Sequence, residues 1–211
     1  MTQLYSPAAF ELNPCFNIYR VADGCPFLWD VIGDPYHGLP PGYNQTWFQQ
    51  ASVKKALHVP ASKDWHLCSS QPVFVNSTDE SLPSGANGGP LASVVEKTNN
   101  VIVGHGLLDM ILIANGTLLG LQNMTWNGKQ GFSTPPNKNF FVPKHNDTSI
   151  WSQAGHGIKG QFVTERGLTF VTIEGAGHEV PMYQPSAAYR HVEKLLGRIP
   201  SLDFMGPFST T

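Results

Sequence analysis

The chain has 211 residues, of which 13% are charged and 41% are hydrophobic, and its formal net charge is −2 at pH 7. A chain of this length can bury a core of its own, which excludes a small scaffold held together by disulfides alone. The near-neutral charge without a Lys/Arg cluster argues against a nucleic-acid partner, and the longest apolar run, 107–114, is too short to span a bilayer.

The first part of the chain, up to about residue 87, is rich in Pro, Gly and aromatic residues and contains only short helix-like stretches such as 50–58. The segment 77–90 contains the run Ser-Leu-Pro-Ser-Gly-Ala-Asn-Gly-Gly-Pro, and these turn-forming residues predict a loop. We therefore expect the organisation of the chain to change near residue 87.

Beyond this loop, the pattern changes to helical and extended segments. The spacing of apolar residues predicts helices at 91–97 and 111–121 and strands at 100–104 and 168–173. The Asn-Gly pair after Trp126 predicts hairpin strands within 122–159. A last helix is expected after Pro185 and before Gly197, with one apolar face formed by Ala188, Val192, Leu195 and Leu196.

Two of the predicted strands end in glycine-rich turns that each carry one chemically active side chain. Strand 100–104 leads into Asp109, and strand 168–173 leads into His178. Functional groups collect at the carboxyl ends of strands in open α/β sheets, and an acid followed by a His in this order matches the last two members of a Ser-Asp-His triad. In such a triad the carboxylate orients the imidazole, which accepts a proton from a hydroxyl nucleophile.

Three other chemistries fit the sequence poorly. The segment 104–109 approaches the dinucleotide-binding fingerprint, but its last position is Asp, which would repel a pyrophosphate. The glycine-rich segment 84–90 is not followed by Gly-Lys-Ser/Thr, so it is not a P-loop. The eight His residues show no metal-ligand spacing, so we expect neither a metal nor a cofactor.

Cysteines and glycosylation motifs indicate a secretory history. The three cysteines, Cys15, Cys25 and Cys68, leave either a free thiol or a bridge to another chain, and the first two could close a local loop. Asn-x-Ser/Thr motifs occur more often than chance predicts, at Asn44, Asn76, Asn115, Asn123 and Asn146. The first residues lack the features of a signal peptide, so we expect an incomplete chain.

Several motifs together resemble the serine carboxypeptidase family. Gly106–Asp109 with Asn115-Gly-Thr resembles the family's Asp motif, and Gly175-Ala-Gly-His-Glu-Val-Pro with Gln184-Pro resembles its His motif. Upstream, 53–58 followed by Trp65 and Cys68 resembles the end of the family's helical insertion, and 13–26 resembles its disulfide-bearing stretch. The resemblance covers nearly the whole chain.

This resemblance implies the C-terminal part of an α/β-hydrolase fold, with a mostly parallel central sheet flanked by helices. Residues 1–87 would be the end of the insertion, or cap, region with its disulfides, and 88–211 would be the end of the hydrolase core. Asp109 and His178 would be the triad acid and base, and Cys68 would bridge to an upstream half. Glu179 would lie at the subsite for the last residue of the substrate in one branch of the family; alternatively, it is a solvated loop acid.

Two departures from the family pattern limit what this chain can do alone. No Gly-x-Ser-x-Gly segment occurs, so the nucleophile is missing, and position 107 is Leu where many relatives have a second Asp. We therefore expect a serine-type carboxypeptidase, secreted or vacuolar when complete, that cleaves peptides only together with its upstream half. The alternatives are a catalytically silent glycoprotein fragment and a related acyltransferase or hydroxynitrile lyase.

Overall fold

The computed structural model describes residues 8–24, 44–66, 69, 72–75, 80–86, 88–145 and 155–209. The chain divides into two compact units, one made of 25–81 and the other of 1–24 together with 82–211. Residues 1–24 thus belong to the unit that contains the central sheet, whereas the sequence groups them with the region that ends at residue 87. The assignment of 1–87 to a cap region stays a prediction.

The smaller unit contains η1 (Trp47–Gln49) and α2 (Ala51–Ala56), in agreement with the helix-like pattern at 50–58. The Phe48 and Trp65 rings stack with their centroids 5.3 Å apart. The Trp65 backbone N–H donates to the Gln49 side chain at 2.8 Å. These contacts connect the two ends of a short helical segment within the unit.

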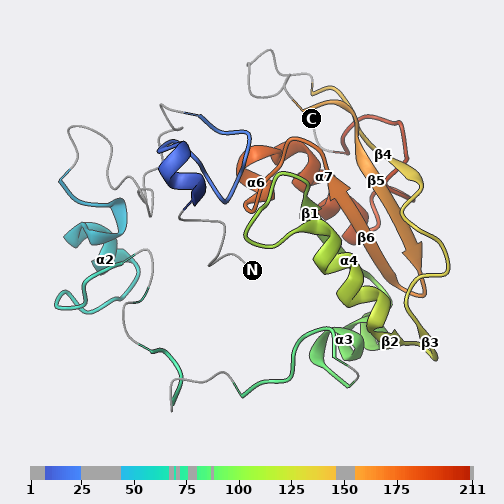
Figure 1. Cartoon of the computed structure of the whole chain (residues 1–211), viewed down its shortest axis with the longest axis horizontal. Helices are drawn as coiled ribbons and strands as arrows, with labels where there is room; N and C mark the ends of the chain where they lie inside the picture. The colour runs from blue at the N-terminus through green and yellow to red at the C-terminus, as the bar shows by residue number, and fades with distance from the viewer. Residues whose placement is uncertain are drawn as a thin grey trace. The chain divides into compact units, whose positions relative to one another are not determined.

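The larger unit contains a four-stranded sheet in the order β1 (Val101–Gly106), β6 (Leu168–Ile173), β5 (Gly157–Glu165) and β4 (Lys138–Val142) (Figure 1). Strands β1 and β6 confirm the two strands that the sequence predicts. Only their pairing is parallel, and the β6–β5 and β5–β4 pairs are antiparallel. The described sheet is therefore mixed, and the expectation of a mostly parallel sheet is wrong for these strands.

The antiparallel pairing follows from a tight turn. Arg166 and Gly167 alone connect β5 to β6, and both have positive φ angles, 50° and 84°. A two-residue turn of this kind reverses the chain and matches the natural twist of the strands, so it can join only antiparallel neighbours.

Helices cover both faces of this sheet, which confirms the α/β class. On one face, Phe162, Val171 and Ile173 form a core with Ala187 of α7 (Pro185–Leu195) and with the C-terminal residues Ile199, Leu202 and Phe208. On the other face, Val163 and Phe170 pack with Val95 of α3 (Pro90–Thr98), Leu121 of α4 (Ala114–Asn123) and Trp126. Consecutive residues of a strand thus point to opposite cores, as the pleat requires.

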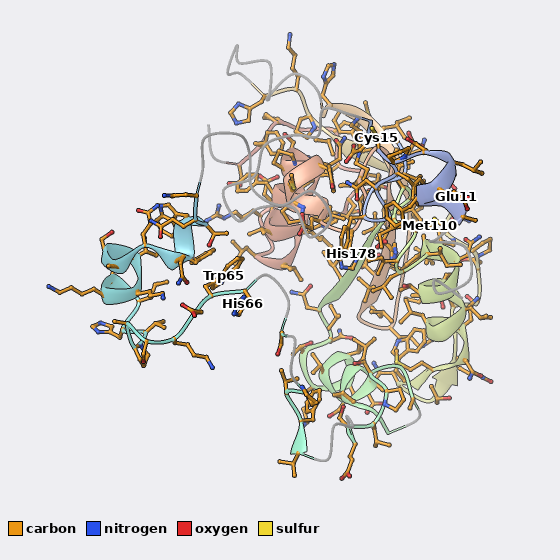
Figure 2. The ribbon with its side chains drawn as sticks, turned by 60° about the vertical axis from the view of Figure 1, so that its left-hand side comes forward. Glu11, Cys15, Trp65, His66, Met110 and His178 are labelled. Atoms are coloured by element: carbon orange, nitrogen blue, oxygen red, sulfur yellow. The ribbon has the colours of Figure 1, made fainter. Side chains whose placement is uncertain are left out.

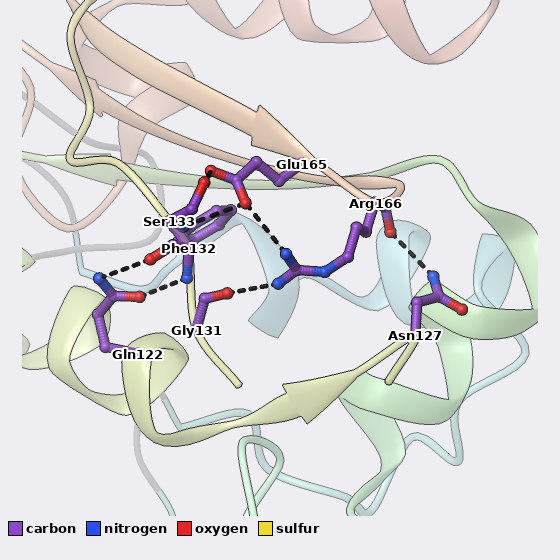
Figure 3. Close-up of polar contacts among 7 residues, drawn as sticks. All are labelled: Gln122, Asn127, Gly131, Phe132, Ser133, Glu165 and Arg166. Atoms are coloured by element: carbon purple, nitrogen blue, oxygen red, sulfur yellow. Dashed lines mark hydrogen bonds and ion pairs between the residues drawn. The ribbon is translucent and has the colours of Figure 1, made fainter. Parts of the chain in front are cut away.

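A small hairpin, β2 (Thr125–Trp126) and β3 (Lys129–Gln130), confirms the hairpin predicted around Asn127-Gly128. The Arg166 guanidinium lies 4.3 Å from the centre of the Trp126 ring. It also donates to Glu165 at 3.0 Å (Figure 3). Asn127 donates in turn to the Arg166 carbonyl at 3.0 Å. These contacts fasten the small hairpin to the turn between β5 and β6.

Two helices differ from their predicted form. These are α4 and α7, whereas helix α3 agrees with the prediction. Helix α4 begins at Ala114 instead of residue 111, because residues 109–112 form a turn in which the Asp109 carboxylate accepts a hydrogen bond from the Leu112 N–H. Helix α7 is found as expected, with Gly197 after it at φ 68°, but the apolar face that the sequence predicts is not the face that packs on the core. Val192, Leu195 and Leu196 are 45%, 40% and 60% exposed, and the face that is buried contains Arg190 and Glu193.

The polar face of α7 can be buried because its two charges pair with each other and with backbone groups, although Arg190 Nε has no hydrogen-bond partner among the described residues. Arg190 donates to Glu193 at 2.7 Å and to the carbonyl oxygens of Phe204, Gly206 and Pro207. These bonds offset the cost of removing two charges from water, and they tie the C-terminal segment to the helix.

Among the described residues, no helix is long and apolar enough to cross a membrane.

Candidate functional site

The parallel pairing of β1 with β6 brings the two chemically active turns together. Gly106, at the end of β1, pairs in register with Ile173, at the end of β6. Asp109 follows β1 by three residues and His178 follows β6 by five, so both lie at the same edge of the sheet. Short helix α6 (Val180–Tyr183) begins directly after the His178 turn.

Asp109 and His178 are joined by a hydrogen bond. His178 Nδ1 lies 2.9 Å from Asp109 Oδ2, and the Asp109 side chain is only 3% exposed whereas that of His178 is 35% exposed. Because a carboxylate can only accept, Nδ1 must carry the proton, and in the neutral ring this leaves Nε2 as the basic nitrogen. The pair therefore presents a partly exposed base that a buried acid orients.

The Asp109 carboxylate is fixed by its own turn. Its Oδ1 accepts the Leu112 backbone N–H at 3.0 Å, while Oδ2 accepts from His178. The two oxygens thus have separate partners, which sets the plane of the carboxylate relative to the imidazole ring.

A segment near the N-terminus, 18–21, links the two turns through backbone hydrogen bonds. Met110 N–H donates to the Ile18 carbonyl and Val21 N–H to the Leu108 carbonyl, each at 3.0 Å. His178 N–H donates to the Tyr19 carbonyl at 2.7 Å. Figure 2 labels Met110 and His178, one from each of the two turns. The Asp109 turn and the His178 turn are therefore held by the same four residues.

Arg20 adds a side-chain contact to this link. Its Nε donates to the Gly175 carbonyl at 3.0 Å, and its guanidinium forms an ion pair with Asp23. The role of segment 18–21 could not be predicted from the sequence, because nothing in its composition reveals hydrogen bonds to residues some 90 and 160 positions away.

Glycines permit the close approach of these backbones. A Cβ added at Gly106 would lie 2.2 Å from the Gly177 carbonyl oxygen, and one at Gly177 would lie 2.0 Å from the Tyr19 carbonyl oxygen. Both distances are too short for a real contact, so a side chain at either position would push the turns apart.

Glu179 is exposed and follows His178 at the start of α6. Burial, together with the nearby carboxylates of Asp23 and Glu179, raises the pKa of Tyr183 to about 12. The Tyr183 hydroxyl therefore remains protonated at physiological pH. A substrate-binding role for Glu179 stays a prediction.

The other predicted site residues lie apart from this pair or outside the described residues. Cys15 is disulfide-bonded, and Cys25 and Cys68 lie outside the described residues, so the expected pairings stay predictions. Asn44, Asn115 and Asn123 are exposed, whereas Asn76 and Asn146 lie outside the described residues. No group of His, Cys, Asp and Glu within the described ranges could hold a metal ion.

A buried acid that orients a histidine at the ends of two sheet strands, with helices on both faces, is an arrangement found in hydrolases of the α/β class. The comparisons with known proteins agree with this class. The chain is 20% identical to the solved structure of Kex1Δp, a prohormone-processing carboxypeptidase from Saccharomyces cerevisiae, with a TM-score of 0.52 over 74% of this chain and 32% of that one. This likeness supports the α/β-hydrolase fold.

The family model for serine carboxypeptidases matches residues 12–198, so the chain belongs to the serine carboxypeptidase family. It is 48% identical to a "Probable serine carboxypeptidase" of Arthroderma benhamiae, over 90% of this chain and 36% of that protein. It is 40% identical to "Serine-type carboxypeptidase F" of Aspergillus niger, over 90% of this chain and 38% of that protein. The chain thus spans little more than a third of the length of these relatives.

Proposed function

We propose that this chain supplies the acid and the base of a serine-type carboxypeptidase, an enzyme that releases C-terminal residues from peptides. The observation that carries the proposal is the 2.9 Å contact between His178 Nδ1 and Asp109 Oδ2, which leaves Nε2 as the basic nitrogen. Membership of the serine carboxypeptidase family supports it.

In this reaction His178 Nε2 accepts the proton of a serine hydroxyl as the serine oxygen attacks the last peptide carbonyl. The same proton then passes to the leaving amine, and an acyl-enzyme remains until water hydrolyses it. Asp109 stays ionised throughout and stabilises the imidazolium form of His178. Glu179, one residue beyond His178, would face the last residue of the substrate.

The nucleophile must come from outside this chain, because no Gly-x-Ser-x-Gly elbow occurs in its sequence. We assign it to an upstream half of the same enzyme, linked through Cys68. The natively produced protein should therefore lose mass on reduction and yield this chain together with a serine-bearing partner. An unchanged mass with and without reductant would contradict the disulfide link.

A chimera tests the activity directly. In it, this chain replaces the segment that it matches in the Arthroderma benhamiae relative. We expect the chimera to release C-terminal amino acids, and His178→Ala to lower kcat by about 10⁴-fold or more, since triad members act as a unit. Asp109→Asn should lower kcat by about 10⁴-fold, because it favours the wrong tautomer of the imidazole.

The control is His156→Ala, which removes an exposed histidine directly before β5 and should leave kcat unchanged. Full peptide release by the His178→Ala chimera would contradict the proposal. Transfer of the acyl group to an added alcohol in preference to water would instead identify an acyltransferase, and cleavage of a cyanohydrin would identify a hydroxynitrile lyase.

The complete protein is proposed to be secreted or vacuolar. The exposed positions of Asn44, Asn115 and Asn123 are compatible with attached glycans. Treatment of the natively produced protein with an endoglycosidase should therefore lower its mass, and an unchanged mass would contradict this assignment.

A further inference from the structure

A second histidine lies beside the acid of the candidate site. His105 is the fifth residue of β1 and is only 8% exposed. Its Nε2 lies 3.6 Å from Asp109 Oδ2, the same oxygen that accepts from His178, and it also contacts the Leu112 carbonyl oxygen. The reaction proposed above makes no use of this residue.

The surroundings of His105 determine where its proton lies. Both neighbours of Nε2, the Leu112 carbonyl and the Asp109 carboxylate, are oxygen acceptors. Because a bare nitrogen lone pair facing two oxygens would be repelled, Nε2 must carry a hydrogen. His105 therefore donates toward the turn that contains Asp109.

Both backbone polar groups of Leu112 are held by this arrangement. Its N–H donates to Asp109 Oδ1 at 3.0 Å, and its carbonyl accepts from His105 Nε2. His105 thus connects the rigid strand β1 to the far end of the turn 109–112, and it brings the positive end of an N–H dipole close to a buried carboxylate.

We propose that His105 is a positioning residue for Asp109, one that holds the carboxylate in the orientation that His178 requires. It touches none of the reacting atoms and acts only through the acid. The inference rests on the proposed function, since it assigns the Asp109–His178 pair a role in catalysis. Spacing alone could not reveal it, because a histidine inside a strand is more often a satisfied core residue.

Two substitutions of similar size separate positioning from simple packing. His105→Gln keeps an amide N–H near the place of Nε2, whereas His105→Leu removes the donor and keeps an apolar side chain. In the chimera, we expect His105→Leu to lower kcat by about 10²-fold with little change in KM, because a small misplacement of a catalytic group costs about this much. His105→Gln should recover most of the rate.

The matched control is His191→Leu. His191 is also mostly buried and lies close to β1 at Gly104, but no contact connects it to Asp109. Its replacement should leave kcat unchanged even if it lowers stability. A loss of kcat in this control equal to that of His105→Leu would overturn the proposal.

A second measurement does not depend on activity. In the chain itself, the nitrogen NMR shifts of the His178 ring report which nitrogen carries the proton. We expect the Nδ1-protonated form in the unsubstituted chain and in His105→Gln, and a mixture of tautomers in His105→Leu. A His105→Leu variant that keeps both the pure Nδ1–H form in the chain and full kcat in the chimera would show that His105 serves packing alone, which overturns the proposal.

An unsubstituted chimera without peptidase activity would contradict the proposed function, while the NMR result would still decide the role of His105.

Discussion

At the scale of single residues, the candidate site is a carboxylate with three neighbours. Asp109 accepts from His178 and from the Leu112 backbone, and His105 lies 3.6 Å away. The sequence indicates Asp109 and His178, because each follows a predicted strand and a glycine-rich turn. It does not indicate His105 or segment 18–21, because their roles depend on hydrogen bonds between distant parts of the chain.

Gly106, at the end of β1, is expected to be essential for the close packing of the Asp109 turn against the His178 turn. Gly106→Ala places a Cβ 2.2 Å from the Gly177 carbonyl oxygen, and backbone atoms cannot move as easily as a side-chain end. We expect it to lower the free energy of unfolding by about 1–3 kcal/mol, as overpacking does. Urea denaturation measures this change.

The matched control for this substitution is Gly120→Ala inside α4, where an added Cβ meets nothing within 4 Å. It should raise the free energy of unfolding by about 0.5–1 kcal/mol, because alanine favours the helix over the unfolded chain. Equal stabilities of the two variants would contradict the close packing of the Gly106 and Gly177 backbones.

At the scale of elements, local patterns predicted β1, β6, α3 and the β2–β3 hairpin. The buried face of α7 could not be predicted from apolar spacing, since the helix buries Arg190 and Glu193 and exposes Val192 and Leu195. A charged pair becomes a buried face only when distant groups satisfy it, here the carbonyls of the C-terminal segment.

The buried ion pair of α7 yields a stability prediction. Burial alone would raise the pKa of Glu193, but the Ser209 backbone N–H and Arg190 outweigh it and hold the pKa below its ordinary value. Arg190→Met leaves Glu193 without its partner and should lower the free energy of unfolding by about 3–5 kcal/mol. Hydrogen exchange should also accelerate at 204–209.

The double variant Arg190→Met, Glu193→Leu should be more stable than the single variant Arg190→Met. A double variant less stable than the single variant would contradict the pairing of Arg190 with Glu193.

A buried histidine in the same helix predicts how stability depends on pH. Burial lowers the pKa of His191 to about 4, and its ring stacks on Phe140 with their centroids 5.1 Å apart. The folded chain thus disfavours the charged ring, whereas the unfolded chain binds a proton near pH 6.5. The stability from His191 is complete above about pH 6.5 and decreases by up to about 3 kcal/mol as the pH falls to 4.

Thermal unfolding between pH 7 and 4 measures this dependence, with His191→Phe as the comparison. Phenylalanine keeps the stacked ring but cannot bind a proton, and His191 Nε2 has no hydrogen-bond partner within the described part of the chain. The variant should therefore lose less stability on acidification than the unsubstituted chain. Parallel pH profiles would contradict the assignment.

At the scale of the whole molecule, the larger unit exposes several large apolar side chains. Leu112, Ile113, Leu119 and Leu196 are each more than half exposed. Among the described strands, β1 pairs only with β6, so one of its edges has no neighbouring strand. Exposed apolar side chains and an open strand edge favour association with another polypeptide.

We accordingly expect the chain to be less stable alone than in the chimera. The midpoint of thermal unfolding should rise in the chimera, and binding of the dye ANS should fall, because the upstream half would cover apolar surface. Equal midpoints and equal dye binding would indicate that the chain does not need such a partner.

The central claim is that Asp109 and His178 together activate a serine. The rate at which a fluorophosphonate probe labels the chimera tests this most directly, because labelling requires an activated serine but no particular substrate. We expect rapid labelling of one serine in the unsubstituted chimera and a labelling rate lower by about 10⁴-fold or more in His178→Ala. Labelling of the His178→Ala chimera at the unsubstituted rate would contradict it.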